Sequence, residues 1–383
     1  MKSVRTITVS LLALGAFVAW APAAALAATH TVSAGESIQA AIDAAAPGDT
    51  VKVNPGDYVG VPAGSSAAAI RITKPLKLIA KSKPSKNVRV RILPDAGNVL
   101  KHGILVEPAN PGDPDVDGVM IKGFTVEGFP KNGIWLRYVN NFKIQGNESI
   151  NNLENGIWPT LSANGSVKKN VAYGSEDAAL WVEASENVRV LKNELHSSPT
   201  GLEITISKNI TVMKNDVHHN TVGIGLYHPA AAGLPPLQPL SENGYWTIKK
   251  NHVYNNNAPN TAPPGSLSGA LPPGGGILVL GVDNVEVSKN TIENNSYFGI
   301  AMIDYCFAVD GTPFDCVTNP PEVADTAPDN NQIFGNTLVG NGTTAPPGYP
   351  AINADIVALL GTNNCFSDNT FMTSTFFPAP VEC

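Results

Sequence analysis

Residues 133–155 read GIWLRYVNNFKIQGNESINNLEN and residues 156–178 read GIWPTLSANGSVKKNVAYGSEDA, so two successive stretches of 23 residues open on Gly-Ile-Trp and carry Asn at matching positions. Short runs inside each stretch, such as Phe142-Lys143-Ile144, alternate apolar and polar residues, which is typical of strands. A repeat of about 20–50 residues indicates a stacked array. Three short strands per repeat, separated by Asn or Gly corners, predict an all-β fold, a single-stranded parallel β-helix or solenoid.

The repeat continues beyond these two stretches. New repeats open at Gly201, Gly223, Gly276 and Gly299, and two Asn series recur at steps of 22 or 23 residues: Asn141, Asn164, Asn187 and Asn209, and Asn147, Asn170, Asn193 and Asn215. Asn tolerates left-handed corners, and stacked side-chain amides can bond along a ladder. We therefore interpret both series as structural and not as ligands.

The composition argues against several classes of protein. With 15% charged and 43% hydrophobic residues, long disordered tracts are not expected. The 25 basic and 32 acidic residues give a net charge of -7, and basic runs are missing, so we expect no nucleic-acid partner. The four cysteines lack CxxC spacing, which argues against zinc-finger, haem and iron–sulfur sites.

The N-terminal end has the pattern of a secretion signal. Lys2 and Arg5 precede an apolar run, and Ala25-Leu26-Ala27 is an A-x-A cleavage pattern. We predict a signal peptide over 1–27 and one secreted or periplasmic domain over 28–383, with no membrane span after cleavage; the alternative is a membrane anchor. Disulfides are allowed in that compartment. Proximity favours Cys306–Cys316 and Cys365–Cys383, although four cysteines permit three pairings.

Three further segments carry a resemblance to a known family: SIQAAIDAAAPGD (37–49), VKVNPGDY (51–58) and VMIKGFTVEG (119–128). They resemble right-handed parallel β-helix proteins with NosD-like repeats, a family that also includes pectate lyases and mannuronan epimerases. The resemblance implies a right-handed coil with an N-terminal capping helix at about 37–46. We divide the chain into an N-terminal cap (about 28–60), coils (about 61–363) and a C-terminal cap (about 364–383).

The resemblance is specific for the fold and not for an activity. The family spans lyases, hydrolases, epimerases and binding proteins, and fold alone does not determine function. The chain has no DPHD-like string, no NTD/DD/GHG set and no WIDH-like string. An activity must therefore be argued from the faces of the predicted coil.

One predicted face carries a row of tryptophans. The residue after each inward-facing apolar residue points outward, and this column reads Trp135, Trp158, Trp181, Glu203 and Gly225. Coils stack about 4.8 Å apart, so the three tryptophans form an exposed row able to stack on sugar rings. With Arg137 and Tyr227 they are the candidate substrate-binding residues. The alternative is that loops or a neighbouring chain cover the row.

Insertions support a groove on this face. Gly223 and Asn251 are 28 residues apart, whereas Gly133 and Asn147 are 14 apart. Further insertions fall at Ala258–Gly274 and near Asp304–Asp329. All three leave the coil next to the Trp-bearing strand, so we expect them to wall one end of the face.

The candidate catalytic residues on this face are Glu183, Glu203 and His228. Glu183 and Glu203 fall on adjacent coils, and paired carboxylates in a sugar groove can serve as acid and base or nucleophile. A β-elimination would instead need a base and a cation that stabilises the enolate-like charge. The face has few basic residues, which argues mildly against a densely anionic polyuronate.

A second face carries weak candidates for metal ligands. The positions after the Asn corners place Glu194 and His196, then Asp216 and His218, then His252 and Tyr254, with His219 beside them. Imidazole and carboxylate groups suit zinc or similar ions, but a solvated polar face is the simpler interpretation. The string Asp113–Gly118 starts like a calcium loop, yet Phe124 stands where the motif needs Glu. A divalent metal such as Ca²⁺ is therefore a conceivable but not a required cofactor.

The sequence predicts a secreted β-helix protein that binds, and modifies as a lyase, hydrolase or epimerase, an extracellular polysaccharide along the Trp face. The alternatives are a non-catalytic glycan-binding adhesion protein and a NosD-like periplasmic metal-handling protein. The sugar, the reaction and the oligomeric state are left open.

Overall fold

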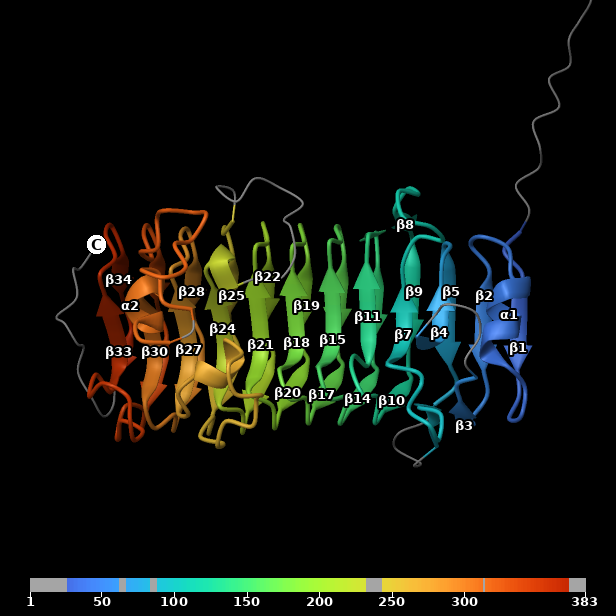
Figure 1. Ribbon diagram of the computed structural model, residues 1–383, viewed down its shortest axis with the longest axis horizontal. Coiled ribbons are helices and arrows are strands. Elements are labelled where there is room, and N and C mark those ends of the chain that lie inside the picture. Colours follow the sequence, from blue (N-terminus) through green and yellow to red (C-terminus); the bar gives the residue numbers. More distant parts are fainter. Residues whose placement is uncertain (1–25, 62–66, 83–87, 232–242, 313, 372–383) are drawn as a thin grey trace, which may run out of the picture.

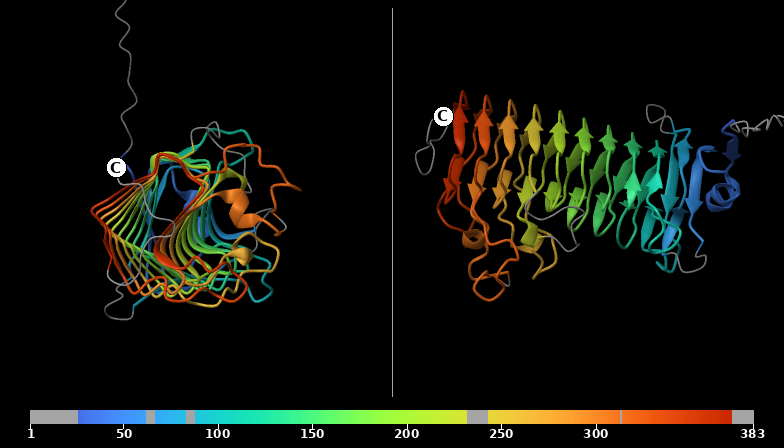
Figure 2. Two further views of the ribbon diagram at one scale, coloured as in Figure 1. Left: turned by 90° about the vertical axis from the view of Figure 1, so that its left-hand side faces the viewer. Right: turned by 90° about the horizontal axis from the view of Figure 1, so that it is seen from above.

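Short strands wind in successive coils about one long axis (Figures 1 and 2). The computed structural model describes residues 26–61, 67–82, 88–231, 243–312 and 314–371. All paired strands between coils run parallel, and strands from successive coils lie side by side in three long sheets. The parallel β-helix predicted from the 23-residue repeat is confirmed. Residues 1–25, most of the predicted signal peptide, lie outside the described part.

The three sheets hold one strand from most coils. The first has 12 strands: β1 (Thr29–Val32), β2 (Thr50–Val53), β5 (Leu76–Ala80), β9 (Val119–Lys122), β13 (Lys143–Gln145), β16 (Ser166–Lys168), β19 (Arg189–Leu191), β22 (Thr211–Met213), β25 (Thr247–Lys249), β28 (Glu286–Ser288), β31 (Gln332–Phe334) and β34 (Cys365–Ser367). The second has 11: β3 (Gly56–Val59), β6 (Val90–Leu93), β10 (Thr125–Glu127), β14 (Glu148–Ile150), β17 (Val171–Tyr173), β20 (Glu194–His196), β23 (Asp216–His218), β26 (His252–Tyr254), β29 (Thr291–Glu293), β32 (Thr337–Val339) and β35 (Thr370–Phe371).

The third sheet carries the candidate site and has 10 strands: β4 (Ala68–Ile72), β7 (His102–Val106), β11 (Ile134–Arg137), β15 (Asn155–Thr160), β18 (Ala178–Glu183), β21 (Thr200–Thr205), β24 (Val222–Tyr227), β27 (Gly275–Leu280), β30 (Phe298–Ile303) and β33 (Ala354–Leu359). A two-stranded pair joins β8 (Val116–Asp117) to β12 (Val139–Asn140). The helical elements are α1 (Ile38–Ala44), α2 (Tyr305–Val309), and the 3-10 turns η2 (Pro229–Ala231) and η4 (Ser268–Ala270).

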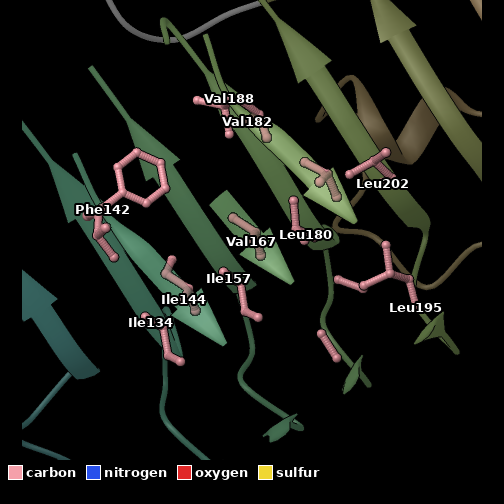
Figure 3. Close-up of a cluster of buried hydrophobic side chains, with 14 of the residues drawn as sticks. Ile134, Phe142, Ile144, Ile157, Val167, Leu180, Val182, Val188, Leu195 and Leu202 are labelled. Atoms are coloured by element: carbon pink, nitrogen blue, oxygen red, sulfur yellow. The ribbon is translucent and has the colours of Figure 1, made fainter. Parts of the chain in front are cut away.

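The core is a column of apolar residues that point into the coil. Ile134 pairs in register with Ile157, which pairs with Leu180, and the next coil adds Leu202. Figure 3 shows these side chains with those of the facing strands, such as Ile144 and Val167. Each inward residue is fully or almost fully buried. Because burying a Leu or Ile side chain contributes about 1.5–3 kcal/mol, the continuous column is the main stabilising feature of the coil.

The two Asn series have different structural roles. The series containing Asn147 and Asn193 is buried, and each side chain bonds the amide of the next coil; for example, Asn193 Nδ2 donates to Asn215 Oδ1 at 2.9 Å. The series containing Asn141 and Asn187 is exposed and adopts left-handed φ values of 54° and 56°. A third, unpredicted ladder runs through Asn220, Asn256, Asn295 and Asn341. The structural interpretation of the asparagines is confirmed.

The N-terminal end is covered by the predicted helix. Helix α1 is shorter than the predicted 37–46, and the Ser37 side chain accepts a hydrogen bond from the backbone N–H of Ala40. Ile38 and Ile42 are its buried residues, which pack on the first coil. This apolar face closes the end of the solenoid.

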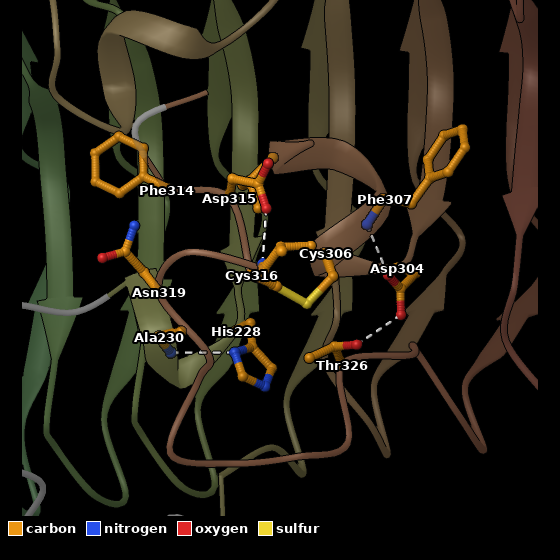
Figure 4. The surroundings of a disulfide bond; sticks show 12 residues. His228, Ala230, Asp304, Cys306, Phe307, Phe314, Asp315, Cys316, Asn319 and Thr326 are labelled. Atoms are coloured by element: carbon orange, nitrogen blue, oxygen red, sulfur yellow. Dashed lines mark hydrogen bonds between the residues drawn. A yellow bond between two sulfur atoms is a disulfide. The ribbon is translucent and has the colours of Figure 1, made fainter. Parts of the chain in front are cut away.

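One predicted disulfide is present. Cys306 and Cys316 are bonded, with Cα atoms 5.5 Å apart, and join α2 to the following loop (Figure 4). Of the second predicted pair, Cys383 lies outside the described residues, so the Cys365–Cys383 prediction stays a prediction.

Candidate active site

The three tryptophans form a stack along the third sheet. Trp135 and Trp158 have ring centroids 5.1 Å apart at an interplanar angle of 8°, and Trp158 and Trp181 are 5.1 Å apart at 9°. His102 lies on the other side of Trp135 at 4.8 Å. The row exists as predicted, but its rings are half-buried and their faces cover one another. The expectation of free ring faces for sugar stacking is therefore wrong for Trp135 and Trp158, which turn their edges outward.

Polar groups hold the stack in place. Trp135 Nε1 donates to Thr160 Oγ1 at 3.3 Å, and Trp181 Nε1 donates to Thr205 Oγ1 at 2.9 Å. The Arg137 guanidinium lies 5.2 Å from the Trp135 ring centroid and 3.9 Å from a Glu107 carboxylate oxygen. Arg137 is thus next to the stack, as predicted, and already has an aromatic and an acidic partner.

Glu203 ends the aromatic row. It pairs in register with Trp181 on one side and with Gly225 on the other. The Tyr227 ring occupies the space above Gly225, because a Cβ atom placed there would approach its Cζ atom to 2.2 Å. Glu203 is only 4% exposed, and its Oε2 atom has no hydrogen-bond partner among the described residues. A carboxyl group is therefore held between two aromatic residues in a nearly dry position.

This environment favours the protonated form of the carboxyl group. Burial raises the pKa of Glu203 well above its ordinary value, and the charges of Asp177 and Glu183 add to the shift. Burial also raises the pKa of Asp177, but hydrogen bonds from Ser268 and Asn155 oppose that shift. Burial thus raises the pKa of both carboxyl groups, and of the two it is Asp177 whose hydrogen bonds oppose the shift.

A pocket of about 420 Å³ opens above these two residues. The coil contributes Glu154, Asp177, Trp181 and Glu203 to its lining, and the inserted loops contribute Leu267 and Ser268 from around η4. The Ser268 hydroxyl donates to the Asp177 carboxylate. Sequence reasoning missed Asp177, which stands just before the strand β18. Asp177 occupies the same position in its repeat as Glu154 does in the previous repeat, and this match of two acidic residues is the signal that could have identified it.

The other predicted catalytic residues lie outside this pocket lining. Glu183 lies on the neighbouring strand, opposite Thr205 and not opposite Glu203, and is fully buried at 0% exposure. His228 is 1% exposed, its Nε2 lies 3.0 Å from the Asp325 carbonyl oxygen, and its Nδ1 accepts the Ala230 N–H (Figure 4). Both imidazole nitrogens are thus engaged by the backbone, which holds the inserted loop against α2.

Tyr227 points outward from the coil but does not reach the surface. It is 0% exposed and belongs to an apolar cluster with Leu278, Tyr305 and Val309. Burial raises the pKa of its phenol well above the ordinary value, and the nearby Glu203 charge adds to this. The prediction that Tyr227 contacts substrate at the surface is corrected, because the inserted segments fold over the outer face of β24, β27 and β30.

The second face carries a stack of rings. Tyr173, His196 and His218 follow one another with centroid separations of 4.5 and 5.0 Å, and Tyr254 lies 4.9 Å from His218. Burial lowers the pKa of His196 and His218. The carboxylates stand beside the rings: Glu194 lies 3.7 Å from His218, Asp216 3.8 Å from His252, and Glu293 2.8 Å from His252.

This arrangement does not support the metal hypothesis. In the described ranges, no group of three or more His, Cys, Asp or Glu side chains is placed to hold a metal ion. The candidates are instead engaged in ring stacking and in contacts between imidazole and carboxylate groups: His196, His218, His252, Glu194 and Asp216. Asp113 accepts hydrogen bonds from Asn110 within its own turn, as expected for an Asp-rich turn.

Comparisons with known proteins agree with the fold. Residues 102–234 match a family model described as "Right handed beta helix region". The A-module of the Azotobacter vinelandii mannuronan C-5 epimerase AlgE4 superposes with a TM-score of 0.62 at 16% identity, covering 90% of this chain and 92% of that one.

A second enzyme is also similar. DFA-IIIase from Arthrobacter chlorophenolicus A6 superposes with a TM-score of 0.53 at 14% identity, covering 86% and 77% of the two chains. At such identities the likeness establishes the fold alone: the chain is a right-handed parallel β-helix protein. A comparison with curated proteins finds no match. Among the residues described, no helix has the length and apolar character needed to cross a membrane.

Proposed function

We propose that this protein is a secreted or periplasmic carbohydrate-modifying enzyme that cleaves a glycosidic bond in the pocket above Glu203. The mannuronan epimerase and DFA-IIIase named above support a carbohydrate as the substrate. The signal-peptide pattern at the N-terminus and the Cys306–Cys316 disulfide support a location outside the cytoplasm. The observation that carries the proposal is the buried Glu203, whose pKa is raised, in the same pocket lining as a second carboxyl group, Asp177.

The two carboxyl groups take different roles. Glycoside cleavage needs one carboxylic acid that protonates the leaving oxygen and one carboxylate that acts as base or nucleophile. Environments that separate the pKa values of two acids assign these roles. Burial favours Glu203 as the general acid, and the Ser268 hydrogen bond favours Asp177 as the carboxylate.

The pocket is less suited to elimination or epimerisation. Both reactions build negative charge beside a sugar carboxylate, which a cation must stabilise. Lys131 is the one basic residue that the described chain contributes to the pocket lining, and its Nζ lies 3.5 Å from Glu154. Hydrolysis or glycosyl transfer is therefore the favoured reaction class.

The test is incubation of residues 28–383 with neutral polysaccharides (inulin-type fructan, amylose, xylan) and with mannuronan. Reducing ends, unsaturated-product absorbance and proton exchange at C5 are followed together. We expect new reducing ends without absorbance, and a fall in rate of about 10²–10⁴-fold for Glu203→Gln, the usual contribution of a general acid.

Glu186→Gln is the matched control. Glu186 lies at a corner of a neighbouring coil and accepts a hydrogen bond from Asn187 at 3.3 Å. Its substitution should leave the rate unchanged. Full activity of Glu203→Gln would refute the assignment of the general acid. Unsaturated-product absorbance would indicate a lyase, and proton exchange at C5 would indicate an epimerase, in place of the proposed hydrolase. Binding without turnover would indicate a non-catalytic glycan-binding protein.

A further inference from the structure

We infer that the Glu203 pocket takes the terminal unit of an uncharged glycan, so that the enzyme shortens its substrate from one chain end. This inference rests on the proposed function and adds the substrate class and the mode of attack. The geometry that points to it is a groove on the third sheet that is closed on one side by a fastened loop.

The closed side begins directly beyond Glu203. On the next coils, the outward positions of β24, β27 and β30 are covered by inserted segments, which bury Leu278, Leu280 and Ile303 in one apolar cluster. The same cluster includes Leu271 from the loop after η4 and Val309 from α2. A small pocket of about 110 Å³ remains among these side chains, and its lining is apolar apart from two tyrosines. A polar sugar chain lying on the sheet is therefore not expected to continue in this direction.

The loop that forms this wall is fastened at several points. Asn260 Nδ2 donates to the Ser268 and Leu271 carbonyl oxygens at 2.7 and 3.0 Å. Tyr349 Oη donates to the Ala270 carbonyl oxygen at 3.0 Å. Ser268 is further bonded to Asp177. These bonds cross-link the loop to itself, to a later loop and to the coil, so the wall is part of the folded structure.

The opposite side is open. The pocket lining continues from Asp177 to Glu154 and then to Lys131 on preceding coils. Beside these residues run the half-buried edges of Trp158 and Trp135. A volume of about 420 Å³ is at the lower end of the usual range for ligand pockets, which suits one or two sugar units with the remaining chain extending over these coils.

The charge of the pocket selects against acidic sugars. Its lining carries the carboxyl groups of Glu154, Glu176, Asp177 and Glu203, and Lys131 is already paired with Glu154. A uronate in this site would lie among like charges in a partly dehydrated environment without a free cation. Hydroxyl groups, in contrast, can donate to the ionised carboxylates and accept from protonated Glu203.

The experiment separates chain-end from internal attack. Linear amylose and inulin-type fructan are compared with cycloamylose and cyclic inulo-oligosaccharide, which contain the same linkages without ends. We expect small products from the first time points, little early loss of viscosity, and at least roughly tenfold slower cleavage of the cyclic forms. Internal fragments with rapid loss of viscosity, or equal rates on linear and cyclic chains, would overturn the inference.

Binding supplies a readout that does not need turnover. The Glu203→Gln protein is titrated calorimetrically with a short linear neutral oligosaccharide of each type, its cyclic counterpart and an oligomannuronate. We expect the linear neutral oligosaccharide to bind at least roughly tenfold more tightly than the other two; equal binding of the three, or no binding, would overturn the inference. If wild type cleaves the substrate and Glu203→Gln is equally active, only the assignment of Glu203 as the general acid is refuted, and the inference of chain-end attack is not.

A loop variant tests the wall itself. Replacing residues 261–270 by a short Gly-Ser linker removes η4 while leaving the strands of the coil intact, and its folding is checked by far-UV circular dichroism. We expect cleavage of cyclic chains to rise relative to linear chains. The variant Tyr349→Phe, which loses one hydrogen bond to the loop, should shift the ratio in the same direction but less; an unchanged ratio in a folded loop variant would contradict the role of the wall.

Discussion

Replacing Asn193 by Ala tests how the coil is held together. Asn193 Nδ2 donates to the Val167 carbonyl oxygen at 3.1 Å and to Asn215 Oδ1 at 2.9 Å. Its Oδ1 accepts the backbone N–H and the side-chain amide of Asn170 at 2.9 and 3.0 Å. The substitution removes all four bonds and leaves the buried Asn170 N–H without a partner, whereas the Val167 carbonyl stays in the parallel ladder between β16 and β19.

The expected loss of stability follows from this orphaned N–H group. A buried backbone group left without a partner costs about 1–3 kcal/mol, so the free energy of unfolding should fall by about 2 kcal/mol. The φ angle of Asn193 is not in the left-handed region, so the Ala variant adds no backbone strain. The assay is urea denaturation, followed by circular dichroism and Trp fluorescence; coincident transitions justify the two-state treatment.

Asn187→Gly is the matched control one corner away. Asn187 is exposed and has φ 56°, a conformation that Gly adopts without strain. We expect a loss of less than about 1 kcal/mol, because water replaces its hydrogen bonds. If Asn193→Ala costs no more than Asn187→Gly, the buried ladder is not the stabilising element that we describe.

Three further predictions concern the site, the disulfide and the Trp stack. Burial raises the pKa of Glu203 in the folded state above its unfolded value, so the folded protein binds that proton more tightly and loses stability as pH rises above the unfolded pKa. The melting temperature of Glu203→Gln, relative to that of wild type, should therefore rise between pH 5 and pH 8. A difference between the two melting temperatures that does not change with pH would contradict the assignment. Cys306→Ser combined with Cys316→Ser opens a link between residues 10 apart and should cost about 2–3 kcal/mol by loop entropy. Reductant should lower the melting temperature of wild type by more than that of the double variant. Trp158→Leu separates Trp135 from Trp181 and should abolish the exciton couplet in circular dichroism, whereas Trp246→Phe, outside the stack, should retain it.

The exposure of the Trp row shows where sequence reasoning stops. The 23-residue register correctly places Trp135, Trp158 and Trp181 in one column, because strand pairing is parallel and in register. The register does not say how a planar side chain is oriented. With coils about 4.8 Å apart, indole rings pack face to face along the axis, which hides the faces and exposes the edges.

The residues of the pocket show the same limit. The sequence pattern makes Glu203 a candidate catalytic residue, because it follows Trp181 in the outward column. Asp177 was not, because its role depends on Ser268, which is 91 residues later and reaches it only after an inserted loop folds back. Tyr227 and His228 occupy outward register positions, yet the segments around α2 cover them, and the sequence pattern contains no measure of that cover.

The coil can be read from the repeat: its three strands per repeat, its buried apolar column, its Asn ladders and its capping helix. These features depend on contacts between neighbouring repeats, so a local period is enough to specify them. The repeat does not show which outward residues reach solvent, which carboxyl groups line one pocket, or where the groove ends; the folded chain does. Those features depend on inserted loops without a period, whose final contacts are made with residues far away in the chain.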